Sequence, residues 1–188
     1  MDLRERIITA ALSCFQEKGI RFTMDDIAAS LSISKKTIYT VFRNKQDLGI
    51  ALADYVFAGI KEAEAAVMQD DTLSTTEKLR KILGVMPENY MAVDFRQLYP
   101  LREKYPAIYD CVENHLQSGW DDTISLLLKG MEEGSIRKIE IPVFKLMFEA
   151  TLAQFFQQDI LVQANLTYNQ ALEEVVGILV DGILTERN

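Results

Sequence analysis

The sequence predicts an all-α protein of about nine helices, with a small N-terminal head and a larger helical domain behind it. Three observations lead to this fold class. Apolar residues recur every three or four positions through most of the 188 residues, which is the period of an amphipathic helix. Side chains that can cap a helix stand just before several of these stretches. Residues 23–45 also read as two short helices joined by a tight turn.

The stretch 23–45, TMDDIAASLSISKKTIYTVFRNK, is the most specific feature of the chain. Thr23 and Ser34 each stand where a helix N-cap belongs, and Asp26 completes a variant of the capping box. The residues 32–34 between the two apolar stripes leave room only for a sharp corner. Outward positions of the second helix are Lys35, Lys36, Thr37 and Thr40, with Tyr39 at the boundary. This pattern is typical of a helix-turn-helix whose second helix enters a major groove.

A third helix precedes this motif and completes the head. Apolar residues recur at helical spacing between Leu3 and Phe15, and Gly19 fits the C-terminal stop. The three helices are expected to share a small core of Leu12, Phe15, Ile27, Leu31, Ile38 and Phe42.

The remaining residues predict a series of helices. Asn44 can cap a long one over 45–67, which has no internal proline and would act as a rigid rod leading away from the head. Further helices are expected over 75–90, 94–105, 107–133, 142–163 and 168–184. The alternation of Ile136, Ile139 and Ile141 is compatible with a strand, but Pro142 and the spacing after it favour a turn into a helix.

The last two predicted helices, 142–163 and 168–184, are apolar on more than one face. Such a helix must be covered on more than one side, and no further segment of the chain follows to cover them. A second copy of the same pair is the economical solution. The sequence therefore predicts a homodimer with a two-fold interface through the last two helices.

Charge is divided unevenly along the chain, whose net charge is −8. Residues 1–48 contain 8 Lys/Arg against 6 Asp/Glu, whereas residues 49–188 contain 12 against 22. Only the first quarter of the chain is suited to meet phosphates, and only weakly in a single copy. This weakness is a second indication of a dimer.

Other classes of protein are disfavoured. No run of about 18 uncharged apolar residues predicts a membrane span, and the amphipathic first residues do not resemble a secretory signal. Cys14 and Cys111 are expected to be reduced, buried thiols of a cytoplasmic protein, with a disulfide or redox pair as the alternative. The spacing of cysteine, histidine and acidic residues does not indicate a metal site. No catalytic set or glycine-rich loop appears, so we expect neither an enzyme nor a cofactor.

Aromatic residues are candidates for a ligand pocket. His115 lies on an apolar helix face, where a structural partner is expected and a ligand contact is the alternative. The aromatic residues between 86 and 156 favour core packing one by one, but together they can line an apolar cavity. We hypothesise that some of Tyr90, Phe95, Tyr99, Trp120 and Phe148 contact a small effector.

The helix-turn-helix resembles that of a known family. Residues 23–48 read T-x-x-x-I-A-x-x-L-x-I-S-x-x-T-I-Y-x-x-F-x-N-K-x-x-L, which is similar to the tetracycline-repressor (TetR/AcrR) family of bacterial regulators. The preceding helix matches through its Phe-x-x-x-Gly ending at Phe15 and Gly19. The motif covers residues 4–48, whereas residues 49–188 resemble the family only in length and helical character.

The resemblance implies a DNA-binding domain over 1–47 and a regulatory, ligand-binding and dimerisation domain over 48–188. Each head would read half of a pseudo-palindromic operator. By position in the motif, Lys36, Thr37 and Thr40 would face base edges or their flanking phosphates. The DNA backbone would be held by Thr23, Ser34, Lys35, Tyr39 and Lys45.

The expected function is that of a ligand-responsive repressor, released from a double-stranded DNA operator by a small apolar or amphipathic effector. Two alternatives stay open. The same scaffold can act as an activator or a constitutive architectural binder. The second alternative is a helical enzyme or adaptor with a vestigial head. The intact motif and the missing catalytic set argue against it.

Overall fold

The computed structural model describes residues 1–87, 101–157 and 160–185. Within these residues the chain forms eleven α-helical segments and one short 3-10 turn, η1 (Gly19–Arg21). Two of the segments, α6 and α10, have four residues each, and the other nine agree with the predicted number. In the described residues, β-type backbone pairing is limited to one isolated antiparallel bridge between Ile136 and Leu184. The all-α prediction is confirmed.

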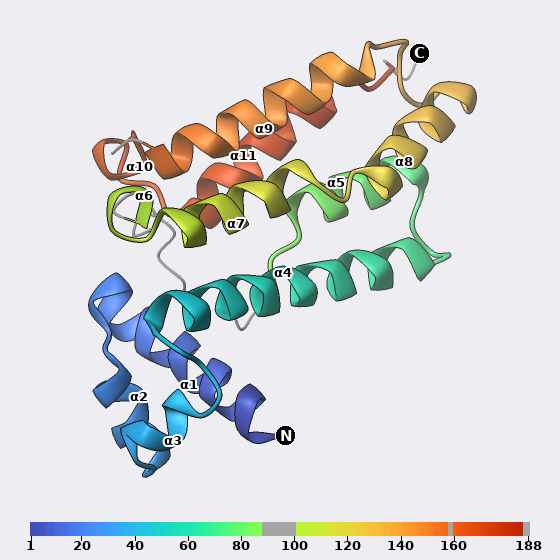
Figure 1. The fold of residues 1–188 in the computed structure, drawn as a ribbon. Helices are drawn as coiled ribbons and strands as arrows, with labels where there is room; N and C mark the ends of the chain where they lie inside the picture. The colour runs from blue at the N-terminus through green and yellow to red at the C-terminus, as the bar shows by residue number, and fades with distance from the viewer. Residues whose placement is uncertain (88–100, 158–159, 186–188) are drawn as a thin grey trace.

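The head consists of α1 (Leu3–Lys18), α2 (Met24–Leu31) and α3 (Lys35–Tyr39), which lie together at one end of the molecule in Figure 1. Its core contains four of the six predicted residues in buried positions: Leu12, Ile27, Ile38 and Phe42. Phe15 and Leu31 are partly buried and pack against the same cluster. The head core was therefore largely predictable from helical spacing.

The long helix α4 (Lys45–Gln69) is shared between the head and the rest of the molecule. Its first half contributes Leu48, Leu52 and Val56 to the head core. Along its opposite side runs α7 (Pro106–Gln117), as Figure 1 shows. Since α4 belongs to both packing units, the division of domains at residues 47 and 48 stays a prediction.

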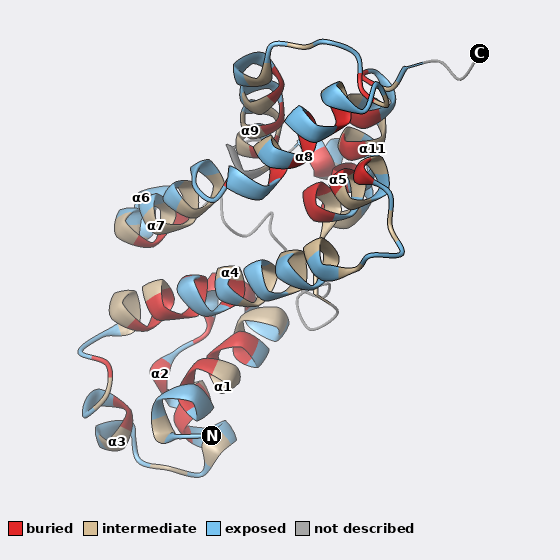
Figure 2. Ribbon diagram, turned by 90° about the vertical axis from the view of Figure 1, so that its right-hand side faces the viewer, coloured by how far each residue is buried: buried red, intermediate tan, exposed pale blue. Residues whose placement is uncertain are grey.

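The remaining helices form a bundle above α4 around a second apolar core. Fully buried side chains at its centre include Leu79, Leu127 and Val180. Figure 2 shows how the buried faces of these helices turn inward. Their bounds are α5 (Thr75–Gly84), α6 (Leu101–Lys104), α8 (Asp121–Glu132), α9 (Ile141–Gln157), α10 (Ile160–Gln163) and α11 (Tyr168–Asp181).

Three predicted helices have different bounds in the structure. The segment 107–133 is two helices, because Gly119 adopts φ +74° and α7 and α8 meet there at an angle. The segment 75–90 ends as a helix at Gly84, where the backbone of Val85 becomes extended. The segment 142–163 is represented by α9 and α10. Of the segment 94–105, only 101–105 lies in the described residues.

Candidate DNA-binding surface and ligand pocket

The helix-turn-helix is closed by local hydrogen bonds that the sequence predicted. The Thr23 hydroxyl accepts from the N–H of Asp26 at 3.2 Å, and the Asp26 carboxylate accepts from the N–H of Thr23 at 2.7 Å. Ser34 caps α3 by accepting from the N–H of Thr37 at 3.1 Å. In the turn, Ser32 adopts φ +53° and Ile33 donates its N–H to the carbonyl of Ala28. The corner is thus held without a glycine.

Six of the eight predicted DNA contacts are gathered on α3 and its two flanking residues. Five of them are exposed, and Thr37 is partly buried. The six are Ser34, Lys35, Lys36, Thr37, Tyr39 and Thr40. Two amines, three alcohols and one phenol on one short helical segment can donate to phosphate oxygens and base edges.

Neighbouring side chains already orient several of these groups. Lys35 forms a salt bridge of 2.7 Å with Asp25 of α2. The hydroxyls of Ser34 and Thr37 lie 2.8 Å apart, and Thr40 donates to the carbonyl of Thr37 at 2.7 Å. Tyr39 is 45 % exposed, so its ring is part packing surface and part outer face. Lys36 is exposed, and no salt bridge to it is seen within the described residues.

Lys45 differs from the other predicted contacts in where its ammonium group lies. It donates to the main-chain carbonyls of Ile20 and Phe22, and it stands over the Phe22 ring at 4.3 Å from the centroid. Desolvation by burial, followed by the charge of Lys104, lowers the pKa of Lys45 from its usual value. The phosphate contact therefore stays a prediction, and the structure gives this side chain a second role that the sequence did not indicate.

A salt bridge stabilises the entry to α2. Lys18 at the end of α1 lies 2.6 Å from the carboxylate of Asp26. The hydrogen bond from Lys18, followed by those from Thr23, lowers the pKa of Asp26 to about 2. The carboxylate of the capping box is therefore charged at neutral pH and ties α1 to the helix-turn-helix.

A pocket of about 110 Å³ lies among α4, α5, α7, α8, α9 and α11. Trp120 and Phe148, two of the five predicted ligand contacts, line it and meet edge to face with ring centroids 5.6 Å apart. The other three, Tyr90, Phe95 and Tyr99, lie outside the described residues. The two described rings are thus both core residues and pocket walls.

Several polar residues at this pocket were missed by the sequence reasoning. Lys61 reaches Glu64 at 2.6 Å and donates to the carbonyl of Gly119 at 3.0 Å, while Thr123 and Tyr168 lie deeper. Burial raises the pKa of the Tyr168 hydroxyl, so this group is neutral at physiological pH. The i, i+3 spacing of Lys61 and Glu64 on α4 was the available signal. A few convergent polar groups in an apolar pocket are typical of a site for a small organic ligand.

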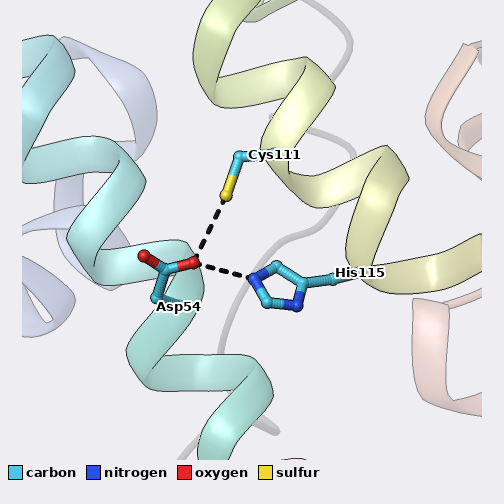
Figure 3. Close-up of side chains that lie close together, drawn as sticks. All are labelled: Asp54, Cys111 and His115. Atoms are coloured by element: carbon cyan, nitrogen blue, oxygen red, sulfur yellow. Dashed lines mark hydrogen bonds and ion pairs between the residues drawn. The ribbon is translucent and has the colours of Figure 1, made fainter. Parts of the chain in front are cut away.

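One cluster of side chains links α4 to α7. The carboxylate of Asp54 lies 2.8 Å from Nε2 of His115 and 3.5 Å from Sγ of Cys111 (Figure 3). Burial, and then the charge of Asp54, raises the pKa of the Cys111 thiol to about 11. The thiol is therefore protonated at neutral pH, which makes it a poor nucleophile for redox chemistry. The i, i+4 spacing of Cys111 and His115 could have revealed half of this cluster, but Asp54 is far away in sequence.

Among the described residues, no helix is both long and apolar enough to cross a bilayer.

The fold and the outer face of α3 define the class: the chain is a DNA-binding protein of the helix-turn-helix type. Residues 7–52 match the profile described as bacterial regulatory proteins, tetR family. Over 182 residues the chain is 24 % identical to the uncharacterized HTH-type transcriptional regulator YvaF of Bacillus subtilis (strain 168), covering 97 % of this chain and 96 % of that protein. Residues 7–52 are therefore a DNA-binding domain of the TetR family, a family of transcriptional regulators and not of enzymes, and the whole chain is similar to an HTH-type transcriptional regulator.

Solved structures agree with this fold over nearly the whole chain. A TetR transcription regulator from Haloarcula marismortui ATCC 43049 superposes with a TM-score of 0.74 at 16 % identity, covering 97 % of this chain and 98 % of that one. The transcriptional regulator FadR from Bacillus subtilis, in complex with stearoyl-CoA, gives 0.58 at 22 % identity, covering 95 % and 98 %. At these identities the similarity extends to the fold alone.

Proposed function

We propose that this chain is a cytoplasmic, ligand-responsive repressor that a small apolar or amphipathic effector releases from a palindromic operator. The observation that carries this proposal is the double role of α4. Val56 is buried in the head core and also lines the pocket beside Phe57 and Ile60. A ligand that displaces these side chains therefore acts on the helix on which the head is built.

The DNA contacts proposed for each head follow its exposed chemistry. Lys36, Thr37 and Thr40 face base edges or nearby phosphates, because they lie on the outer side of α3. Thr23, Ser34, Lys35 and Tyr39 position the head on the backbone, as phosphate contacts do in most protein–DNA complexes. Lys45 contributes to the same backbone contact from the start of α4.

A homodimer through α9 and α11 supplies the second head. Large apolar side chains on these helices face solvent in the single chain, with exposed fractions of 64 % for Leu146 and 69 % for Ile178. Val143 and Met147 of α9 are also more than half exposed. Several exposed large apolar side chains on two neighbouring helices are typical of an interface in an oligomer. Pairing two such faces would place two weakly cationic heads on one duplex.

The effector class follows from the pocket lining. Apolar and aromatic side chains form most of the wall, and Lys61, Glu64 and Thr123 supply a polar side. A pocket of about 110 Å³ is smaller than most drug-sized ligand sites, so a larger effector must push the surrounding helices apart. That requirement is itself a route from binding to helix movement. The complex of the similarly folded FadR with stearoyl-CoA supports an amphipathic effector.

The proposed switch is the distance between the two heads. Recognition helices must stand about 34–36 Å apart to enter successive major grooves. An effector that prefers a dimer with a different spacing weakens DNA binding, and DNA weakens effector binding by the same factor.

The test uses the full-length protein and the DNA that flanks its gene. We expect tight, salt-dependent binding to an inverted repeat in that DNA, measured by fluorescence anisotropy, and release by members of a panel of apolar and amphipathic compounds. Expression from a reporter promoter that carries the repeat should rise when an active compound is added. Reporter output that falls with the compound would identify an activator, and absence of binding to any flanking repeat would refute the proposal.

A further inference from the structure

The cluster of Asp54, Cys111 and His115 combines three different metal-ligating groups on two packed helices. One potential ligand atom from each residue lies within 4.8 Å of the other two. Figure 3 shows the three side chains pointing toward one another across the contact between α4 and α7. We propose that these three residues form a binding site for a divalent transition-metal ion of the zinc class.

The spacing of the donor atoms suits such an ion. A tetrahedral ion with bonds of about 2.0–2.3 Å holds its ligand atoms roughly 3.3–3.8 Å apart. The Asp54 oxygen lies 3.5 Å from the Cys111 sulfur and 2.8 Å from the His115 nitrogen. These two separations are therefore close to those that coordination requires. The thiol proton leaves to solvent when the sulfur binds the ion.

The choice of ligands selects the class of ion. Thiolate and imidazole together favour borderline and soft ions over Mg²⁺ and Ca²⁺, which prefer oxygen ligands throughout. Three protein ligands leave a fourth position, which water can occupy because the site faces solvent. The Asp54 side chain is 56 % exposed and that of His115 is 33 % exposed, so an ion can reach the site directly.

The surrounding structure holds the cluster in place. Gly49, on α4, lets Ile108 of α7 approach so closely that a Cβ at position 49 would lie 2.2 Å from its Cδ1 atom. This close packing keeps Asp54 opposite Cys111 and His115. The imidazole also stacks on Phe57, with centroids 4.6 Å apart and planes 11° apart, which limits its rotation.

The experiment uses untagged full-length protein, freed of metal by chelator, and Co²⁺ as the spectroscopic probe. We expect one Co²⁺ per chain, with a sulfur-to-cobalt charge-transfer band and the intense visible bands of tetrahedral coordination. Zn²⁺ should displace Co²⁺ and remove these bands. Zn²⁺ should also raise the thermal unfolding midpoint, because a ligand that binds only the folded chain stabilises it.

Variants assign the site. Cys111→Ser should abolish the charge-transfer band, and Asp54→Asn and His115→Gln should each weaken Co²⁺ binding about tenfold or more. Asp110→Asn, on the rim of the same surface, and Cys14→Ala, at the other thiol, are the matched controls and should bind as the parent does. Circular dichroism of the metal-free variants checks that each is folded.

Three results would overturn the proposal: binding only at millimolar Co²⁺, a sulfur band that survives Cys111→Ser, or equal affinities in Asp54→Asn, His115→Gln and the parent. Asp54→Asn and His115→Gln test the site independently of Cys111. The proposal can therefore still be refuted if the Cys111→Ser protein does not fold. No DNA is used, so this outcome is separate from that of the proposed repressor function.

Discussion

The ammonium group of Lys45 lies 4.3 Å from the centroid of the Phe22 ring, on the inner side of the head. A cation over an aromatic face is attracted by the ring, and here the same group also satisfies the carbonyls of Ile20 and Phe22. The side chain that the helix-turn-helix pattern assigns to a phosphate therefore also joins the start of α4 to the loop between α1 and α2.

Lys45→Ala should consequently lower both DNA affinity and head stability. We expect the free energy of unfolding to fall by about 1.5–3 kcal/mol, because charge-assisted hydrogen bonds to buried carbonyls are lost. DNA affinity should fall equally for all sequences, with a flatter salt dependence. Arg43→Ala removes an exposed charge nearby and should leave stability unchanged. Full stability in Lys45→Ala, measured by urea unfolding, would show that the inward contacts contribute little.

Lys36 and Lys35 should differ in what their loss does to sequence preference. Lys36→Ala should cost about 1–3 kcal/mol of binding and relax the preference at one base position, because this side chain extends from the outer face of α3. Lys35→Ala should weaken binding evenly, since Asp25 holds its ammonium group beside α2. Affinities for a panel of single-base operator variants measure both effects. An even loss for Lys36→Ala would move this residue to the DNA backbone.

The free energy of unfolding of the head should depend on pH through the ionisation of Asp26. Its folded pKa of about 2 lies below the ordinary aspartate value of 3.8, so its contribution is complete above pH 3.8 and is lost as the pH falls through about 2. Asp26→Asn should remove this part of the pH dependence, and Lys18→Met should shrink it because Lys18 is the main cause of the shift. Urea unfolding of variant and parent across this pH window gives the difference. Parallel pH profiles would contradict the assignment.

The exposed apolar face of α9 and α11 should decide the oligomeric state. Leu146→Glu and Ile178→Glu each place a charge in the proposed interface, and we expect monomers in sedimentation at micromolar protein. DNA affinity should fall sharply in both, because one head binds weakly alone. Leu128→Glu on α8 is the control, since its side chain is 54 % exposed outside α9 and α11. Dimers in both interface variants would place the interface elsewhere.

Local patterns were sufficient to predict much of the head. The caps at Thr23 and Ser34, the corner at Ser32 and the buried positions of Ile27 and Ile38 follow from residues near them in sequence. The break between α7 and α8 does not follow from spacing, because the apolar residues before and after Gly119 form one continuous periodic stretch. The continuation of the head core into α4 was missed for another reason: the apolar face of α4 is uniform, and nothing in it marks which partner it packs against.

What the sequence by itself determined is the helical class and the helix-turn-helix, and it also supplied the prediction that α3 is the surface for DNA. Each depends on spacing within a few turns of one helix or on a cap beside it. Only the tertiary structure decided the inward position of Lys45, the polar side of the pocket and the meeting of Asp54 with Cys111 and His115. These depend on contacts between residues 23 to 61 positions apart. Such contacts are set by how the helices pack. The helical periodicity of a sequence shows which face of a helix is apolar, but it does not specify which other helix that face contacts.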